Sequence, residues 1–226
     1  MSATLDGAAA APPTRRSRVP AVLGMAGLAA LAAGAALILL LQFLPPTSRL
    51  SAIRLTISEY GLTANKAYFD VAVILVALGS ALLFVVHLLH GTLRALSAAT
   101  LLATVWTVSL LVIVAFPKTN WAVGPSAGGT VHRIASVAGF LCLPVAILAA
   151  TGRVFPRARA WRRTARLLGA ASLAWFGVII GAAVLIPASA GPWWAVLPLG
   201  LVERLLAVTE LLAVATLAVP LLRSQA

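Results

Sequence analysis

Long apolar runs, separated by short connections that contain proline, glycine or charged residues, fill the chain after residue 20. Each run approaches or exceeds the roughly 20 residues that an α-helix needs to cross about 30 Å of hydrocarbon. Because backbone groups in lipid must bond within the chain, these runs are predicted to be helices of an all-α integral membrane bundle. The six predicted transmembrane helices are residues 21–44, 68–91, 96–116, 132–152, 165–189 and 200–222.

The same pattern divides the chain into a tail and one membrane domain. Residues 1–20 are rich in alanine, proline, serine and arginine without apolar periodicity, and we predict a disordered basic cytoplasmic tail. Residues 21–223 form the transmembrane domain. The first run, about 24 residues, is longer than the roughly 7–15 residues of a signal-peptide core, so we expect an uncleaved helix.

Composition excludes an ordinary water-soluble domain. Hydrophobic residues make up 62% of the chain and charged residues 10%, too few to cover a surface that faces water. The net charge of +12 comes without a nucleic-acid-binding motif, and basic residues beside membrane spans set topology and contact anionic lipid. We therefore expect membrane lipids as partners and no nucleic acid.

Small residues bear on protein partners, and the absence of common motifs bears on cofactors. Gly177 and Gly181 form a GxxxG pair that predicts close packing of another helix, so a membrane-protein partner or a second copy of the chain is also considered. The sequence contains no P-loop, GxSxG, HExxH or CxxC pattern, and we expect no cofactor and no metal site.

Arginine is concentrated in the predicted connection between the fourth and fifth spans. Its members are Arg153, Arg157, Arg159, Arg162, Arg163 and Arg166. The positive-inside rule places this connection, and with it both chain ends, in the cytoplasm, which predicts a multi-pass plasma-membrane protein. The same arginines are candidates for contact with lipid headgroups.

Acidic residues are few, and all but Asp6 fall in the predicted outer half. Glu59 lies in the first outer connection, and Asp70 and Glu203 each lie about one turn into a span. Glu210 falls near the midplane, where an ionised carboxylate costs several kcal/mol, so we expect it to face the bundle and to be either paired or protonated. Its spacing from Glu203 puts both glutamates on one helix face.

Histidines fall at both ends of the predicted bundle. His132 opens the fourth span on the outer side, where it can join the acids in a polar pocket or in ion pairs that hold the helices in register. His87 and His90 lie at the other end of the second span, about 25 Å from Asp70 along the helix axis. We expect these two to be interfacial residues near the inner leaflet.

Several short motifs resemble one family. ISEYG occupies residues 57–61, YFD residues 68–70 and FP residues 116–117; His132 follows a glycine-rich loop, and GLVER occupies residues 200–204. Together they resemble the bacterial and archaeal membrane proteins called domain of unknown function 998, over nearly the whole chain from the first span onward. That family is uncharacterised, so the resemblance implies a polytopic helical bundle and no activity. Its patterned positions are Ser58, Glu59, Gly61, His132, Glu203 and Arg204.

Three functions are compatible with the sequence. The favoured one is non-enzymatic: binding or movement of a lipid-like or small ligand through an outer-facing pocket. The candidate pocket residues are Ser58, Glu59, Asp70, His132, Glu203 and Glu210. The second is an intramembrane hydrolase or transferase that uses His132 with Glu203 or Glu210 as acid and base, with Ser58 as the only candidate hydroxyl nucleophile. The third is a structural or assembly role in the membrane.

Overall fold

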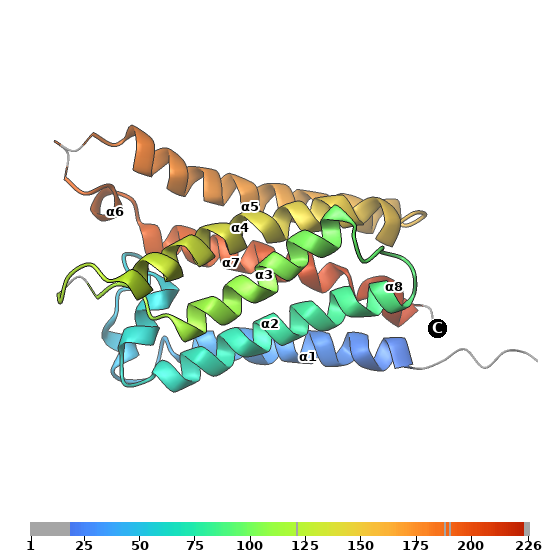
Figure 1. Ribbon diagram of the computed structural model, residues 1–226, viewed down its shortest axis with the longest axis horizontal. Coiled ribbons are helices and arrows are strands. Elements are labelled where there is room, and N and C mark those ends of the chain that lie inside the picture. The colour runs from blue at the N-terminus through green and yellow to red at the C-terminus, as the bar shows by residue number, and fades with distance from the viewer. Residues whose placement is uncertain (1–18, 121, 188, 190, 224–226) are drawn as a thin grey trace, which may run out of the picture.

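The computed structural model describes residues 19–120, 122–187, 189 and 191–223, which fold as an all-α bundle (Figure 1). Among these residues, six helices are long and apolar enough to cross a membrane, which confirms the predicted membrane bundle. They are α1 (Val19–Leu40), α2 (Lys66–Leu89), α3 (Ala98–Ala115), α4 (Ala127–Val154), α5 (Arg159–Leu185) and α7 (Leu199–Thr216), the last continued by α8 (Val219–Arg223). Of the predicted tail, residues 1–18 lie outside the described residues.

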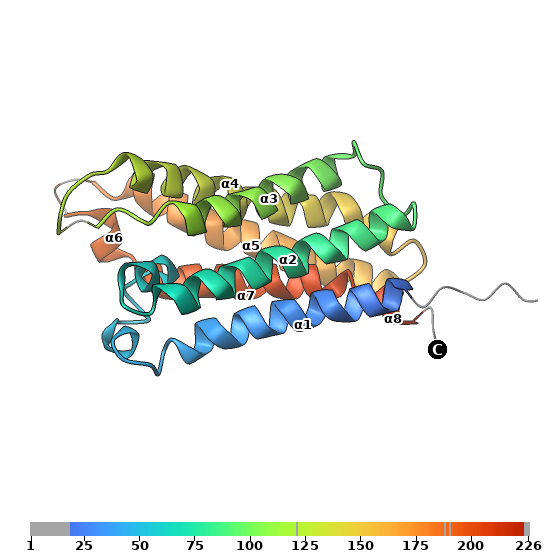
Figure 2. The same ribbon diagram turned by 60° about the horizontal axis from the view of Figure 1, so that its bottom comes forward.

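Neighbouring helices pack as hairpins. α1 packs on α2, α3 packs on α4, and α5 contacts both α4 and α7, whereas α1 and α7 touch each other only weakly. The connections contain the short turns η1 (Thr47–Arg49), η2 (Ile57–Leu62) and α6 (Trp193–Val196). Figures 1 and 2 show these turns at one end of the bundle, called here the loop end, and the start of α1 with α8 at the other, the termini end.

Helix α4 begins earlier than expected, at Ala127 rather than at residue 132. Ser126 caps it, since its Oγ accepts a hydrogen bond of 3.0 Å from Gly129 N. A Cβ at Gly129 would lie 2.6 Å from Thr119 N, so only glycine fits here. The expected glycine-rich loop before His132 is therefore largely the first turn of α4, and its glycine serves close packing.

The arginine-rich segment is mostly helical instead of forming an open connection. Arg159, Arg162, Arg163 and Arg166 lie on the first turns of α5, and Arg166 Nε donates a hydrogen bond of 3.2 Å to Thr151 Oγ1 of α4. Arginine has good helix propensity, and its long side chain keeps the charge in water while the helix continues past the apolar stretch. Arg153 lies in the last turn of α4 and Arg157 in the tight turn between the helices.

Glycines bring the backbones of α1 and α2 together. A Cβ at Gly79 of α2 would lie 2.7 Å from the carbonyl oxygen of Gly27 in α1, and one at Gly34 would lie 2.7 Å from the carbonyl oxygen of Ala72. Gly177 and Gly181 differ, because a Cβ at either would meet no atom of a neighbouring element within 4 Å in the described chain. The predicted GxxxG pair of α5 therefore makes no such contact inside this bundle.

The last predicted span is broken between α7 and α8. Pro220 has no N–H to offer the carbonyl of Thr216, so regular hydrogen bonding stops at Thr216. His87 of α2 is buried here, and its Nε2 donates a hydrogen bond of 2.9 Å to Leu217 O. His87, which we expected at the inner membrane interface, lies in the last turn of α2 and is packed inside the protein against the helix break.

Candidate functional site

At the loop end, the first residues of α7 hold the connection that follows α1. Glu203 Oε2 accepts a hydrogen bond of 2.7 Å from Ile57 N, and Arg204 Nη1 donates one of 2.9 Å to Leu55 O. The backbone N–H of Leu201 donates to Ile53 O at 3.1 Å. A Cβ at Gly200 would lie 2.7 Å from the carbonyl oxygen of Ala52, so glycine permits this close approach.

Tyr60 ties three elements together. Its side chain is buried, and its hydroxyl accepts hydrogen bonds from Arg204 Nη2 at 2.9 Å and from Gln42 Nε2. The Arg204 guanidinium also lies 5.8 Å from the Tyr60 ring centroid, within reach of a cation–π contact. η2 is thus held between the end of α1 and the start of α7.

A second polar cluster connects η2 to the end of α3. Lys118 Nζ forms an ion pair with Glu59 and donates a hydrogen bond of 2.9 Å to Thr56 Oγ1. The Lys118 and Glu59 side chains are only 21% and 22% exposed. Partial burial strengthens such a pair relative to one in open water, so the cluster fixes the 56–59 backbone.

His132 makes its hydrogen bonds with a carbonyl and a serine. Its ring is buried, with Nδ1 2.8 Å from Phe116 O and Nε2 3.1 Å from Ser58 Oγ. Because a carbonyl oxygen can only accept, Nδ1 carries the proton, and in the neutral ring Nε2 accepts from the Ser58 hydroxyl. Phe116 lies at the C-terminus of α3, so the end of that helix orients the imidazole.

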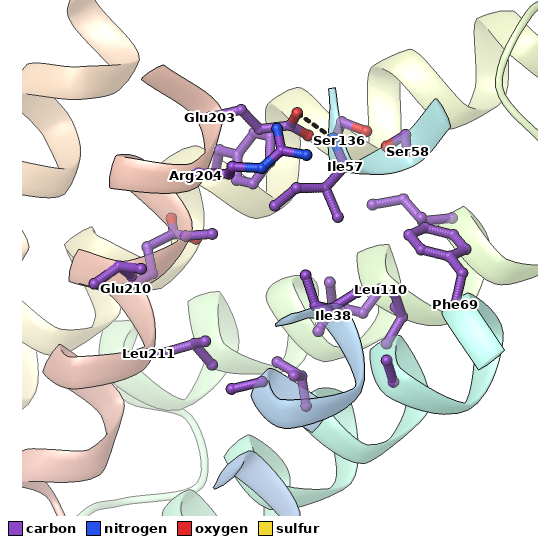
Figure 3. A pocket seen from close by; sticks show the side chains of 18 of the residues that line it. Ile38, Ile57, Ser58, Phe69, Leu110, Ser136, Glu203, Arg204, Glu210 and Leu211 are labelled. Atoms are coloured by element: carbon purple, nitrogen blue, oxygen red, sulfur yellow. Dashed lines mark hydrogen bonds between the residues drawn. The ribbon is translucent and has the colours of Figure 1, made fainter. Parts of the chain in front are cut away.

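Two cavities adjoin this network. The central cavity, about 450 Å³, is lined by α1, α2, α3, α4, α7 and the 52–58 segment. In Figure 3 the labelled residues Ser58, Ser136, Glu203 and Arg204 lie along one side of the cavity, and Ile38, Leu110 and Leu211 lie on the other. Glu210 lies apart from the first group, lower on α7. The α4–α5 cavity, about 470 Å³, is more polar and includes Arg54, Glu59, Lys118, His132 and Arg133.

Four residues separate the two cavities, because they line both. They are Ser58, Ser136, Phe140 and Glu203. Ser136 Oγ donates a hydrogen bond of 2.9 Å to the backbone carbonyl of His132. The partition therefore combines two hydroxyls, one carboxylate and one aromatic ring.

Glu210 lies in the central cavity below this partition. It is 1% exposed, and neither carboxyl oxygen has a hydrogen-bond partner among the described residues. It follows Glu203 by two helical turns, as the shared helix face predicts. A buried polar group without a partner is costly, which makes Glu210 a candidate functional residue.

Comparison with protein families assigns the chain to one of them. The family model described as "Protein of unknown function (DUF998)" matches residues 28–220 of the 226. The chain belongs to this family. Comparison with curated proteins and with solved structures gives no match. The DUF998 match confirms the resemblance based on the short motifs, and it includes every residue of the two cavities.

In this DUF998 protein, five of the six predicted pocket residues line a cavity. They are Ser58, Glu59, His132, Glu203 and Glu210. Asp70 lies outside both cavities and forms an ion pair with Lys66, one turn earlier on α2. The six arginines of the fourth connection lie at the termini end, away from the site (Figure 1). Among the described residues, no group of three His, Cys, Asp or Glu side chains forms a metal site.

The observed hydrogen bonds also correct the predicted acid–base pair. The pairing of His132 with Glu203 or Glu210 as acid and base is not formed, because both ring nitrogens bond to Phe116 O and Ser58 Oγ. Sequence reasoning gave no role to Gln42 and Tyr60. Gln42 carried a signal, since it is a lone amide near the end of the apolar first run.

Replacing Glu210 with leucine is expected to raise the free energy of unfolding by about 1–3 kcal/mol, because it removes a buried carboxyl group that lacks a partner. Thermal unfolding of the purified protein in detergent measures this gain. Glu210→Gln is the matched control, since it keeps the size and the polarity and should give little gain. A fall in stability with Glu210→Leu would show that the carboxyl group is bonded after all.

Proposed function

We propose that this membrane protein binds a lipid-like amphiphile in its central cavity. One observation carries the proposal: the cavity is apolar over most of its lining and has Gln42, Ser58, Glu203 and Arg204 gathered at the loop end, with Glu210 as a further polar residue deeper on α7. An apolar chain would lie among α1, α2, α3 and α7, and a polar group would face Glu203 and Arg204. Its volume of about 450 Å³ lies within the roughly 300–1,000 Å³ of small-molecule sites.

The rim of the central cavity supports entry from the bilayer. Leu39 of α1 and Val208 of α7 both line the cavity, yet they are 62% and 52% exposed. Exposed leucine and valine on membrane helices face lipid, so a mouth lies between α1 and α7. These two helices contact each other only weakly, which leaves room for an acyl chain to enter sideways.

The proposal is tested with a phospholipid that carries a photoreactive diazirine in its acyl chain. We expect cross-links to peptides of α1 and α7 that line the cavity. Ala207→Phe places an aromatic ring in the cavity and should lower this cross-linking about tenfold, which corresponds to about 1.4 kcal/mol of binding. Mass spectrometry of the peptides gives both results.

The matched control is Ala170→Phe, which makes the same change at an exposed position of α5. It should leave the cross-linking of the cavity peptides unchanged. If cross-links fall only on lipid-facing positions such as Leu78 and Val184, and Ala207→Phe changes nothing, the cavity does not bind an amphiphile.

We also propose that the loop end faces outward across the plasma membrane, with both chain ends in the cytoplasm. The arginines at the ends of α4 and α5 support this orientation through the positive-inside rule. In a Cys142→Ala background, Asn120→Cys should react with an impermeant maleimide on intact cells, and Arg157→Cys should react only after permeabilisation. The reverse pattern would overturn the orientation.

A further inference from the structure

We propose that Ser58 is the nucleophile of an ester-hydrolysing site, that His132 is its general base, and that the substrate is an acyl ester lying across the junction of the two cavities. The substrate class rests on the proposed amphiphile pocket. The nucleophile rests on separate evidence, namely the hydrogen bonds of Ser58 and His132.

The Ser58–His132 contact has the geometry of an activated hydroxyl. A serine nucleophile needs a base within hydrogen-bond reach, and the base needs a third group that fixes its tautomer and orientation. Here Ser58 Oγ is 3.1 Å from His132 Nε2, and Phe116 O accepts from Nδ1 at 2.8 Å. A backbone carbonyl thus fills the orienting role that a carboxylate fills in the serine–histidine–aspartate arrangement.

Ser136 shows why the assignment goes to Ser58. Both serines line both cavities, so both are open to the same ligand. The Ser136 hydroxyl, however, donates to the backbone carbonyl of His132, which cannot take up its proton. The two serines therefore differ in chemistry while sharing a location.

The position of Ser58 between the cavities suits a substrate with two unlike parts. The acyl chain would occupy the apolar central cavity, and the alcohol part of the ester would occupy the more polar α4–α5 cavity. The ester carbonyl would then lie at the partition, beside Ser58 Oγ. An exposed rim is present on this side too, since Ile180 and Trp194 line the α4–α5 cavity and are 42% and 48% exposed.

Lys118 supplies positive charge for the transition state. It lines the α4–α5 cavity together with Ser58 and His132, and two of its three N–H donors are used by Thr56 and Glu59. The third donor is left for the oxyanion that forms when the carbonyl is attacked. Glu203 acts as a positioning residue, because it holds the backbone of Ile57 next to Ser58.

The reaction has two balanced halves. Ser58 Oγ attacks the ester carbonyl while its proton passes to His132 Nε2; the imidazolium then returns this proton to the departing alkoxide, which leaves as the alcohol. Water next attacks the acyl-Ser58 ester and gives its proton to His132 Nε2. The acyl–Ser58 bond breaks, the proton passes to Ser58 Oγ, and a carboxylic acid is released.

Two fluorophosphonate probes of different chain length test the site in the purified full-length protein. Ser58 displaces fluoride from phosphorus and becomes covalently labelled, and peptide mass spectrometry locates the label. Ser58→Ala should abolish the labelling, and Ser48→Ala, at an exposed serine outside both cavities, should leave it unchanged. His132→Gln should slow it about 100-fold, since a general base contributes roughly 10²–10⁴-fold. Absence of label on Ser58 with both probes overturns the proposal.

A thiol series covers the case in which His132→Gln does not fold. In a Cys142→Ala background, Ser58→Cys beside the imidazole should react with iodoacetamide about tenfold faster than Ser136→Cys, because His132 accepts the thiol proton. Equal rates would remove His132 as the base.

The two probes also separate this inference from the amphiphile proposal. Ala207→Phe should block the long-chain probe and spare the short one. If Ser58 reacts equally with both probes and Ala207→Phe has no effect, Ser58 is a nucleophile but the central cavity does not bind an amphiphile. If the photoreactive phospholipid cross-links in the central cavity but neither probe labels Ser58, the cavity binds an amphiphile but Ser58 is not a nucleophile.

Discussion

Replacing Glu203 with alanine is expected to destabilise the protein by about 1–3 kcal/mol, because Ile57 N would lose its acceptor in a partly buried place. The 51–57 segment would loosen from α7, and Ser58 would lose its fixed distance from His132. We therefore expect Ser58 labelling by the short fluorophosphonate to slow at least tenfold, or by about 1.4 kcal/mol in activation free energy. Thermal unfolding in detergent and the labelling rate give the two readouts.

Glu203→Gln is the matched control for this prediction. Its amide oxygen can still accept from Ile57 N, so most of the stability and of the labelling rate should be kept. If alanine and glutamine lower both quantities equally, the charge of Glu203 matters more than its hydrogen bond. If Glu203→Ala leaves both unchanged, Glu203 does not hold the 51–57 segment.

Gly79→Leu is expected to lower the free energy of unfolding by about 3 kcal/mol or more, at or above the upper end of the usual cost of overpacking. Even its Cβ would come within 2.7 Å of the Gly27 carbonyl oxygen and 2.9 Å of Leu31 N, and backbone atoms cannot change rotamer to make room. α1 and α2 would have to separate. Thermal unfolding in detergent, followed by size-exclusion chromatography, measures the loss of folded protein.

The control is Gly177→Leu on α5, where the described chain leaves open space around the Cβ position. It changes the same residue type on a membrane helix, and we expect unfolding within about 0.5 kcal/mol of the parent protein. Equal losses at the two positions would show that α1 and α2 are not held at contact distance by glycine.

The fold was predictable because span length and apolarity are properties of continuous sequence. The helix boundaries were less predictable. Pro220 marks the break after Thr216 in the sequence, but the imidazole that bonds to Leu217 O comes from α2, and the early start of α4 depends on the contact between Gly129 and Thr119. Such contacts join segments that are far apart in the sequence, so the apolar pattern of each run does not show them.

The site was partly predictable for a different reason. Polar groups are costly in lipid, so Glu203, Glu210 and His132 were expected to face the interior together, and they line adjoining cavities. The pairing of His132 with Ser58 was not accessible, since 74 residues separate them and only the η2 turn brings them together. Asp70 was grouped with the site by its depth in the bundle, yet Lys66 neutralises it locally.

The glycine contacts between α1 and α2 have a consequence for the proposed mouth between α1 and α7. Backbone carbonyl oxygens lie 2.7 Å from the Cβ positions of Gly34 and Gly79, and the side chains of Val76 and Leu31 fill the space beside them. Separating α1 from α2 would open these contacts, so we expect the two helices to move together in any widening of the gap towards α7. The hairpin packs on the rest of the bundle mainly through the contact of α2 with α3, and we expect it to hinge there.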